Sequence, residues 1–213
     1  KPQSLYWGFF INFGSKRNFK ITLKMKNTIK IIIIALISIN ASCQVTTIVP
    51  YKTVEYPNGA YIKDTNNEFT FWIDTWEGIS NNKKYTFILF QQNLIYFSNN
   101  AYHYRDEVVA KLKVFDLLTN QTIYDESSYT NYDDYKINGI IIRDSEFLFG
   151  LYDKEVYCYN RARFSFVKNI TNPNQIVYKN FEYGFYNYFD CTYPDQLSIP
   201  MFLPTEEFIL TRQ

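Results

Sequence analysis

Short runs in which apolar and polar residues alternate recur along the second part of this 213-residue chain. Residues 111–116 alternate in this way, and so do residues 161–166, where Ala162, Phe164 and Phe166 would share one side. A strand with one face in a core and the other in water has this period of two. Aromatic residues make up 20% of the chain and suit half-buried strands. We therefore expect a mostly β protein.

Further strands are expected at residues 84–90, 94–97, 137–142, 155–159, 175–178 and 208–211. The polar step after residue 90 is interpreted as a hairpin turn, and Asn138-Gly139 as another, because both of these residues tolerate positive φ. Residues 106–114 are a stretch where a helix competes, since Val108 and Leu112 would share a helical face. About eight to ten short strands with polar turns predict an antiparallel barrel or a sandwich.

An export signal is predicted between Met25 and Cys43. Residues 25–30 are a basic start, residues 31–39 are an uncharged apolar run, and Ala41 and Ser42 are small residues before the cysteine. This nine-residue run matches a signal core but is too short for a helix to span about 30 Å of hydrocarbon. A transmembrane anchor and a buried core segment are the alternatives. Residues 1–24 are interpreted as an upstream extension, and residues 25–42 as the signal.

Cys43 resembles the lipid-modified cysteine of bacterial lipoproteins, although Asn40 stands where an apolar residue is usual. Acyl chains on Cys43 would make a membrane surface the partner of the domain without a spanning helix. Ordinary cleavage after Cys43 is the alternative. The expected location is the cell envelope, periplasmic or at the outer membrane, and otherwise the medium.

The charge of the chain is divided unevenly. Seven of its 22 Lys and Arg residues, and none of its 21 Asp and Glu residues, lie within residues 1–42. The remainder is acidic, and an acidic domain without a basic cluster is a poor nucleic-acid binder. This remainder suits one domain, with an irregular lead-in at residues 43–60 and a single β domain at residues 61–213.

Two cysteines follow the export segment, Cys158 and Cys191. An exported protein folds where a disulfide can persist, so one bond between them is expected. Two buried free thiols are the alternative.

Residues 59–69, Gly-Ala-Tyr-Ile-Lys-Asp-Thr-Asn-Asn-Glu-Phe, precede Trp76-Glu77-Gly78, and the chain ends with a Pro-rich tail at residues 199–211. In these segments the chain resembles an uncharacterised family of bacterial exported proteins. The tail looks like the closing strand of that family. The resemblance implies a similar fold and brings no established activity.

Residues 71–78 are also similar to the opening of lipocalin-like barrels, where a helical turn leads into a Gly-x-Trp at the first strand. Asp74 stands in place of the glycine. The resemblance implies an antiparallel lipocalin-like barrel in which Trp76 closes the bottom. In the alternative Trp76 is an ordinary buried residue of a strand, and it is structural in both cases.

Catalytic and metal-binding patterns are scarce in this sequence. The one histidine, His103, stands without a Gly-x-Ser-x-Gly elbow, and three scattered cysteines with one histidine cannot build a zinc site. No glycine-rich phosphate loop is present. We therefore expect no enzymatic activity, no catalytic residue, no metal and no cofactor.

Three short acidic segments each have a structural and a functional interpretation. Asp64 to Glu68 is similar to the start of a calcium loop but lacks its glycine, so an Asx-type turn is preferred. Asp125-Glu126 and Asp133-Asp134 are candidate carboxylate pairs for glycoside hydrolysis, and solvated loop acids otherwise.

Tyrosine is abundant and would form either a stacking surface for sugars or a partner protein, or ordinary strand faces. The tyrosines considered are Tyr129, Tyr132, Tyr135, Tyr183, Tyr186 and Tyr188. The leading hypothesis is a non-enzymatic binding module for a small apolar or amphipathic ligand inside the barrel. The alternatives are an envelope interaction protein with a filled barrel and a carboxylate-based hydrolase.

Overall fold

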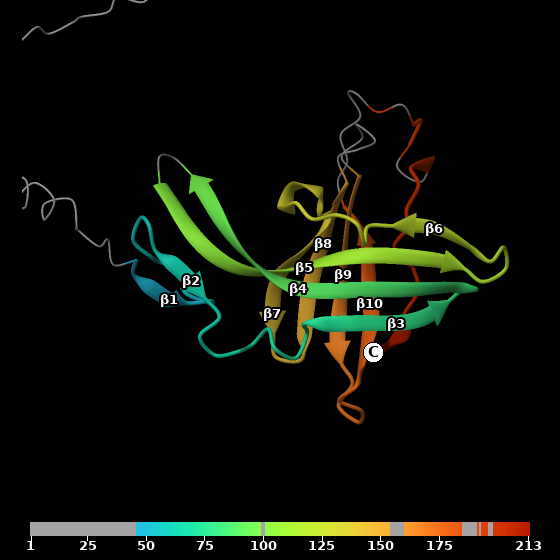
Figure 1. Ribbon diagram of the computed structural model, residues 1–213, viewed down its shortest axis with the longest axis horizontal. Coiled ribbons are helices and arrows are strands. Elements are labelled where there is room, and N and C mark those ends of the chain that lie inside the picture. Colours follow the sequence, from blue (N-terminus) through green and yellow to red (C-terminus); the bar gives the residue numbers. More distant parts are fainter. Residues whose placement is uncertain (1–45, 99–100, 154–159, 185–190, 192, 196–197) are drawn as a thin grey trace, which may run out of the picture. The chain divides into compact units, whose positions relative to one another are not determined.

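The computed structural model describes residues 46–98, 101–153, 160–184, 191, 193–195 and 198–213. The strands in these ranges are β1 (Ile48–Pro50), β2 (Tyr61–Lys63), β3 (Asp74–Ser80), β4 (Lys83–Ser98), β5 (Ala101–Asp116), β6 (Gln121–Asp125), β7 (Ile137–Arg143), β8 (Glu146–Asp153), β9 (Asn160–Lys168), β10 (Gln175–Tyr183) and β11 (Phe208–Arg212) (Figure 1). A short 3-10 helix, η1 (Tyr132–Asp134), precedes β7. No helix within the described ranges has the length and hydropathy to cross a membrane.

Eight of the strands close into an antiparallel barrel. Neighbours pair in the order β3, β4, β5, β7, β8, β9, β10 and β11, and β11 pairs back with β3. The step from β5 to β7 is made by Val109 and Ala110, which lie opposite Asn138 and Ile137. The predicted antiparallel lipocalin-like barrel is confirmed, and residues 208–211 form its closing strand.

The hairpin of β4 and β5 is longer than the barrel needs. The two strands pair from Lys83 opposite Asp116 to Ser98 opposite Ala101. The half near Lys83 belongs to the barrel, and the other half projects beyond it with β2 and β1 added in parallel to β5 (Figure 1). The lead-in at residues 43–60 is therefore not wholly irregular, because β1 lies within it and finds a partner in β2.

The prediction of a hairpin turn after residue 90 is wrong. Gln91, Gln92 and Asn93 continue β4, and Asn93 lies opposite Asp106. Gln91 and Asn93 are exposed, so polar side chains reach water here without ending the strand. Residues 106–114, where a helix was the alternative, are strand as well.

The turn expected at Asn138-Gly139 is also wrong, because both residues lie inside β7. The chain reverses later, where Asp144 has a φ of +49°. Gly139 is required by packing, since a Cβ there would lie 2.6 Å from Cζ of Phe147. The register with β8 shifts between Gly139 and Ile141, which marks a β-bulge.

Aromatic rings fill the interior of the barrel. Phe87, Phe164, Phe166 and Tyr178 are each 0% exposed, and the centroids of all pairs of these rings lie 5.0 to 6.0 Å apart. The Tyr178 hydroxyl donates to the carbonyl oxygen of Pro204 at 2.7 Å, so its polar atom is satisfied. The core positions expected in β9 are confirmed as buried: Ala162, Phe164 and Phe166.

Trp76 lies in β3 and is fully buried. Its Nε1 donates to the carbonyl oxygen of Trp72 at 2.8 Å, across the turn that leads into the strand. The Arg212 guanidinium lies over the Trp76 ring, with Cζ 4.7 Å from the centroid, and its Nη2 donates to the carbonyl oxygen of Phe71 at 2.7 Å. Trp76 and Arg212 thus tie the start of the barrel to its closing strand.

Gly78→Ala is expected to lower the free energy of unfolding by about 1–3 kcal/mol. A Cβ at Gly78 would lie 2.4 Å from the carbonyl oxygen of Ile209 and 2.9 Å from Cε2 of Phe208, and the backbone of β11 cannot yield without loosening the closure. Gly150→Ala is the control, since its nearest neighbour is the mobile Cδ1 of Ile140 at 3.2 Å. Urea denaturation measures both variants, and equal stability would contradict the close approach.

Candidate binding site

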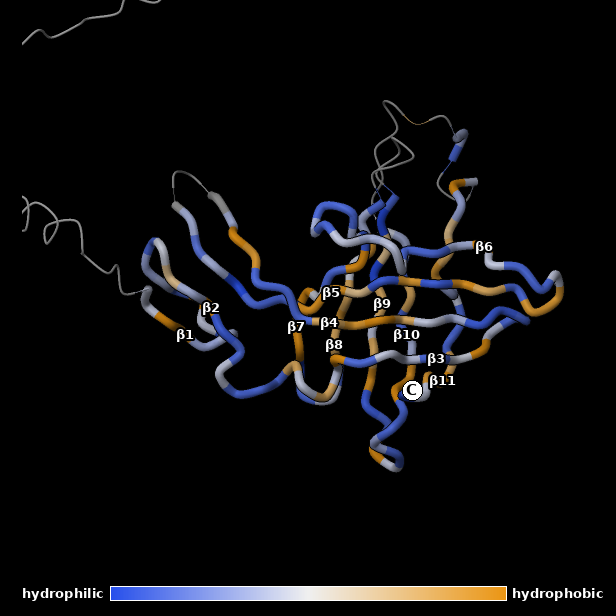
Figure 2. Tube along the Cα trace, in the orientation of Figure 1, coloured by the Kyte–Doolittle hydropathy of each residue, from blue (hydrophilic) through white to orange (hydrophobic). Residues whose placement is uncertain are grey.

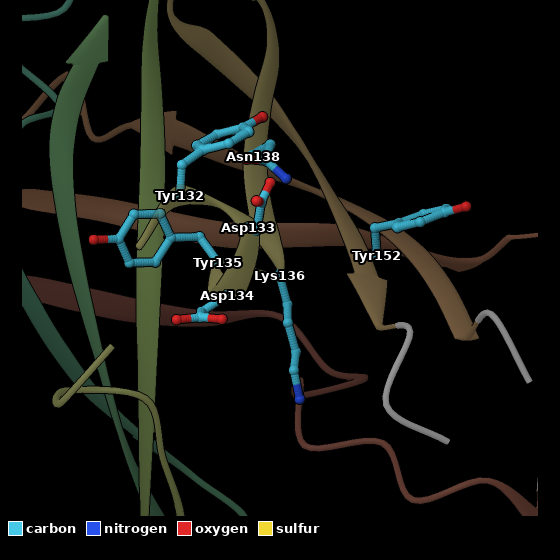
Figure 3. Close-up of a pocket in the computed structure, with 7 residues that line it drawn as sticks. All are labelled: Tyr132, Asp133, Asp134, Tyr135, Lys136, Asn138 and Tyr152. Atoms are coloured by element: carbon cyan, nitrogen blue, oxygen red, sulfur yellow. The ribbon is translucent and has the colours of Figure 1, made fainter. Parts of the chain in front are cut away.

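An open pocket of 240 Å³ lies on the outer wall of the barrel. It is lined by the connection from β6 to β7 and by β7 and β8: Tyr132, Asp133, Asp134, Tyr135, Lys136, Asn138 and Tyr152 (Figure 3). The pocket is outside the barrel because Asn138 alternates along β7 with Ile137, whose side chain is fully buried in the core.

The connection bends at η1, where a backbone turn spreads consecutive side chains apart. Asp134 N donates to the carbonyl oxygen of Asn131 at 3.1 Å, and Tyr135 N donates to that of Tyr132 at 3.0 Å. Tyr132 and Asp133 are exposed, whereas Tyr135 is 8% exposed. The turn therefore presents one ring and the carboxylates to solvent and packs the other ring against the barrel.

Tyr135 is held by an aromatic and a cationic neighbour. Its ring meets Phe90 edge to face, with centroids 5.2 Å apart. The Lys111 Nζ lies 5.6 Å from both ring centroids and donates to the carbonyl oxygen of Ser127 at 3.1 Å. These contacts fix the floor of the pocket.

Tyr132 stands at the rim, with its ring centroid 6.4 Å from that of Tyr135. Its hydroxyl is hydrogen-bonded to Tyr96, which is hydrogen-bonded to Glu107. Burial raises the pKa of Tyr132, and the nearby Glu107 carboxylate raises it further. Tyr132 therefore stays neutral at physiological pH and leans on the projecting part of the β4–β5 hairpin.

Tyr152 forms the opposite wall. The Arg161 guanidinium lies over its ring, 4.4 Å from the centroid, and Nη2 donates to the Tyr152 hydroxyl at 2.8 Å. The backbone N of Tyr152 donates to the carbonyl oxygen of Lys136 at 2.7 Å. The Arg161 guanidinium therefore covers one face of the ring.

Lys136 lines the pocket but turns its amine away from it (Figure 3). Its Nζ pairs with Asp153 Oδ1 at 3.3 Å and lies 5.4 Å from the Tyr124 ring centroid. Asp133 and Asp134 also line the pocket, and both are exposed. The site is acidic and aromatic.

A buried carboxylate, that of Glu126, holds the start of the connection from β6 to β7. Glu126 is 1% exposed, and its carboxylate accepts from the Tyr124 hydroxyl at 2.5 Å and from Leu112 N at 2.9 Å. Burial raises the pKa of Glu126, and these hydrogen bonds and the Lys136 ammonium oppose that shift. The carboxylate anchors the β6–β7 connection to β5.

Asn138 contributes an unused acceptor at the pocket wall. Its Oδ1 is buried and has no hydrogen-bond partner among the described residues. A buried acceptor without a partner costs about 1–3 kcal/mol. A ligand could reach this oxygen only if the half-buried amide rotates.

Neither candidate carboxylate pair faces across a cleft. Asp125 turns outward to Lys113 Nζ at 3.2 Å, while Glu126 turns inward. Asp133 and Asp134 follow each other on η1 and point in different directions (Figure 3). Glycosidic chemistry needs two carboxyls on opposite sides of one bond, which these pairs do not offer.

Asp64 holds the loop that follows it, although its hydrogen bonds reach four and five residues ahead and not two as in the expected Asx-type turn. Its two carboxylate oxygens accept from the backbone N of Glu68 at 2.8 Å and of Phe69 at 2.9 Å, so both are used within this loop. The backbone N of Asp64 donates to the buried Asp106 carboxylate at 3.0 Å. This acidic cluster is structural.

His103 packs between the rings of Tyr56 and Tyr96, with centroids 4.8 and 5.2 Å away. Burial lowers the pKa of His103, and the charge of Arg105 lowers it further. The imidazole is a packing residue in this environment.

Several predicted positions lie outside the described residues, among them Cys43, Cys158, Tyr186 and Tyr188. Cys191 is disulfide-bonded, and its pairing with Cys158 stays a prediction. Tyr129 and Tyr183 are described but do not line the pocket.

Sequence reasoning named Tyr132, Tyr135 and the two aspartates but missed Asn138 and Tyr152 as site residues. Tyr152 lies near the end of residues 146–153, where buried and less buried residues alternate, and this alternation could have predicted the strand. Asn138 was predicted to be a turn residue. Only the pairing of β7 with β8 brings both to one wall.

No group of three or more His, Cys, Asp or Glu side chains within the described part of the chain is placed to hold a metal ion. Comparison of the chain with protein-family models, curated proteins and solved structures finds no match. The class that the fold defines is an antiparallel β-barrel with a filled interior.

Glu126→Gln is expected to change how stability depends on pH. A carboxyl with a raised pKa in the folded state stabilises the fold below the unfolded pKa of about 4.3, and this stabilisation is lost as pH rises through the folded pKa. The variant stays neutral, so its stability relative to wild type should increase as the pH rises above about 4 through the raised pKa of Glu126. Thermal unfolding across this range measures the difference. Glu182→Gln, at an exposed position of β10, is the control and should run parallel to wild type.

Proposed function

We propose that this protein is a non-enzymatic binding module that holds a saccharide in the tyrosine pocket on the outer wall of the barrel. The observation that carries this proposal is the grouping of three tyrosines, two exposed aspartates and one asparagine with an unpaired side-chain oxygen around a single 240 Å³ pocket. The proposal places the protein in the cell envelope as an exported, lipid-anchored domain.

The filled interior argues for a ligand outside the barrel. Buried rings occupy the centre, and the space at the mouth beside Tyr124 and Phe202 measures 10 Å³. A space of that size has room for about one water molecule and for no larger ligand. The packed interior thus supports the alternative of a filled barrel over an apolar ligand held within it.

The chemistry of the pocket matches a sugar. A sugar ring offers a face of C–H groups, which packs on an aromatic face, and a rim of hydroxyls, which donate hydrogen bonds. Tyr132 and Tyr152 supply aromatic faces, and Asp133 and Asp134 supply acceptors. Hydrogen bonds to charged acceptors are stronger than neutral ones, which suits weakly acidic hydroxyl donors. The volume fits one ring and not a long glycan.

The charge of the pocket predicts selectivity. With the Lys136 amine paired to Asp153, the carboxylates of Asp133 and Asp134 would repel an acidic sugar. Neutral and amino sugars are therefore the expected ligands.

A glycan array with neutral, amino and acidic monosaccharides and short glycans tests the proposal. The full chain should retain neutral or amino sugars, and Tyr132→Ala and Asn138→Ala should each weaken binding about three- to tenfold in calorimetry. Tyr183→Ala is the matched control, because Tyr183 is 38% exposed and Tyr132 is 36% exposed. Failure of all these sugars to bind, or equal loss in the control, would overturn the saccharide assignment.

Lipid attachment at Cys43 is tested separately. Metabolic labelling with a radioactive fatty acid should label the wild-type chain, and Cys43→Ala should lose the label and the membrane fraction, because the thiol is the acceptor of the acyl group. Cys191→Ser is the control and should keep the label. A labelled Cys43→Ala variant would remove the anchor from the proposal.

A further inference from the structure

The projecting half of β4 has one edge without a strand partner. Pairing with β3 ends where Asp74 lies opposite Leu89, and no other described strand continues along that side. Pairing with β5 continues on the other side to Ser98. From Phe90 to Ser98, β4 is therefore the outer strand of a four-stranded extension made with β5, β2 and β1 (Figure 1).

This edge lacks the charged residues and prolines that usually prevent a free strand edge from pairing with another chain. Residues 90–98, Phe-Gln-Gln-Asn-Leu-Ile-Tyr-Phe-Ser, contain no charge and no proline. The shorter free edges are protected, since β1 ends at Pro50, β6 ends at Asp125 and β7 ends at Arg143. An uncharged edge of this length can therefore pair with another uncharged strand without charge repulsion.

One apolar row crosses the extension and stops at this edge. Ile48 pairs with Tyr61, Tyr61 pairs with Tyr104, and Tyr104 pairs with Ile95, so the four side chains share one face. Ile48 is 56% exposed and Ile95 is 51% exposed. Figure 2 shows the apolar stretch on the projecting part of β4.

We propose that β4 of one copy pairs antiparallel with β4 of a second copy through residues 92–98. A two-fold axis at Ile95 places Ile95 opposite its own symmetry mate, so the apolar row continues into the row of the second copy. A two-fold contact of this kind uses up both edges and closes the assembly as a dimer. The absence of charge on the edge means that identical strands do not repel each other, and a charged peptide would find no ion pair there.

The dimer is independent of the saccharide pocket. Ile95 lies on the opposite face of β4 from Tyr96, the residue that contacts Tyr132 at the pocket rim. A substitution at Ile95 therefore leaves the ligand site in place, and the two proposals can fail separately.

Light scattering on the purified full chain tests the dimer. Wild type should be dimeric, and Ile95→Lys should lose the dimer, because two ammonium groups would lie opposite each other. Ile209→Lys is the matched control, since Ile209 is also 51% exposed but lies on β11, which pairs on both sides. A monomeric wild type, a dimeric Ile95→Lys variant or a monomeric control would each overturn the proposal.

Cross-linking tests the same contact without repulsion. In a Cys43→Ala background, Ile95→Cys should form a disulfide-linked dimer under oxidation, whereas Ile209→Cys should remain a monomer on non-reducing gels. No linked dimer with Ile95→Cys, or as much with Ile209→Cys, would contradict pairing centred on residue 95.

Discussion

Packing of four aromatic rings inside the barrel is the interaction on which the rest of this structure depends. Phe87 comes from β4, Phe164 and Phe166 from β9, and Tyr178 from β10, so strands distant in sequence meet only when the sheet closes. Each buried ring removes about 150–250 Å² from water, which makes these rings the main apolar contribution to folding. Closure through β11 and the Trp76–Arg212 contact holds them together.

Because the barrel is filled, the pocket and the free strand edge both lie outside it. Two structures project from the ring of strands, the β6–β7 connection and the far half of the β4–β5 hairpin. The first is held by the buried Glu126 carboxylate and by Tyr135 against Phe90, and it carries the pocket. The second carries a free strand edge. Rigid strands beneath both position their side chains without help from a ligand.

Local patterns predicted strands well where alternation was regular, as at residues 111–116, 161–166 and 208–211. They failed at residues 91–93 and at Asn138-Gly139, because polar residues and an Asn-Gly pair are typical of turns when neighbours are ignored. In the folded protein Gly139 makes room for Phe147. The pocket was only half predictable, since its tyrosines and aspartates are consecutive on η1, whereas Asn138 and Tyr152 arrive from two paired strands.

The sequence by itself determined the β class, the residues that face the core and the acidic, tyrosine-rich surface, because alternation and composition are local properties. Tertiary structure alone decided that the barrel closes, that its interior is filled, and that Lys136 turns from the pocket to Asp153. These outcomes depend on strand register and on contacts between residues far apart in the chain. A one-residue change of register would exchange the faces of a strand, and no local pattern reports which partner sets it.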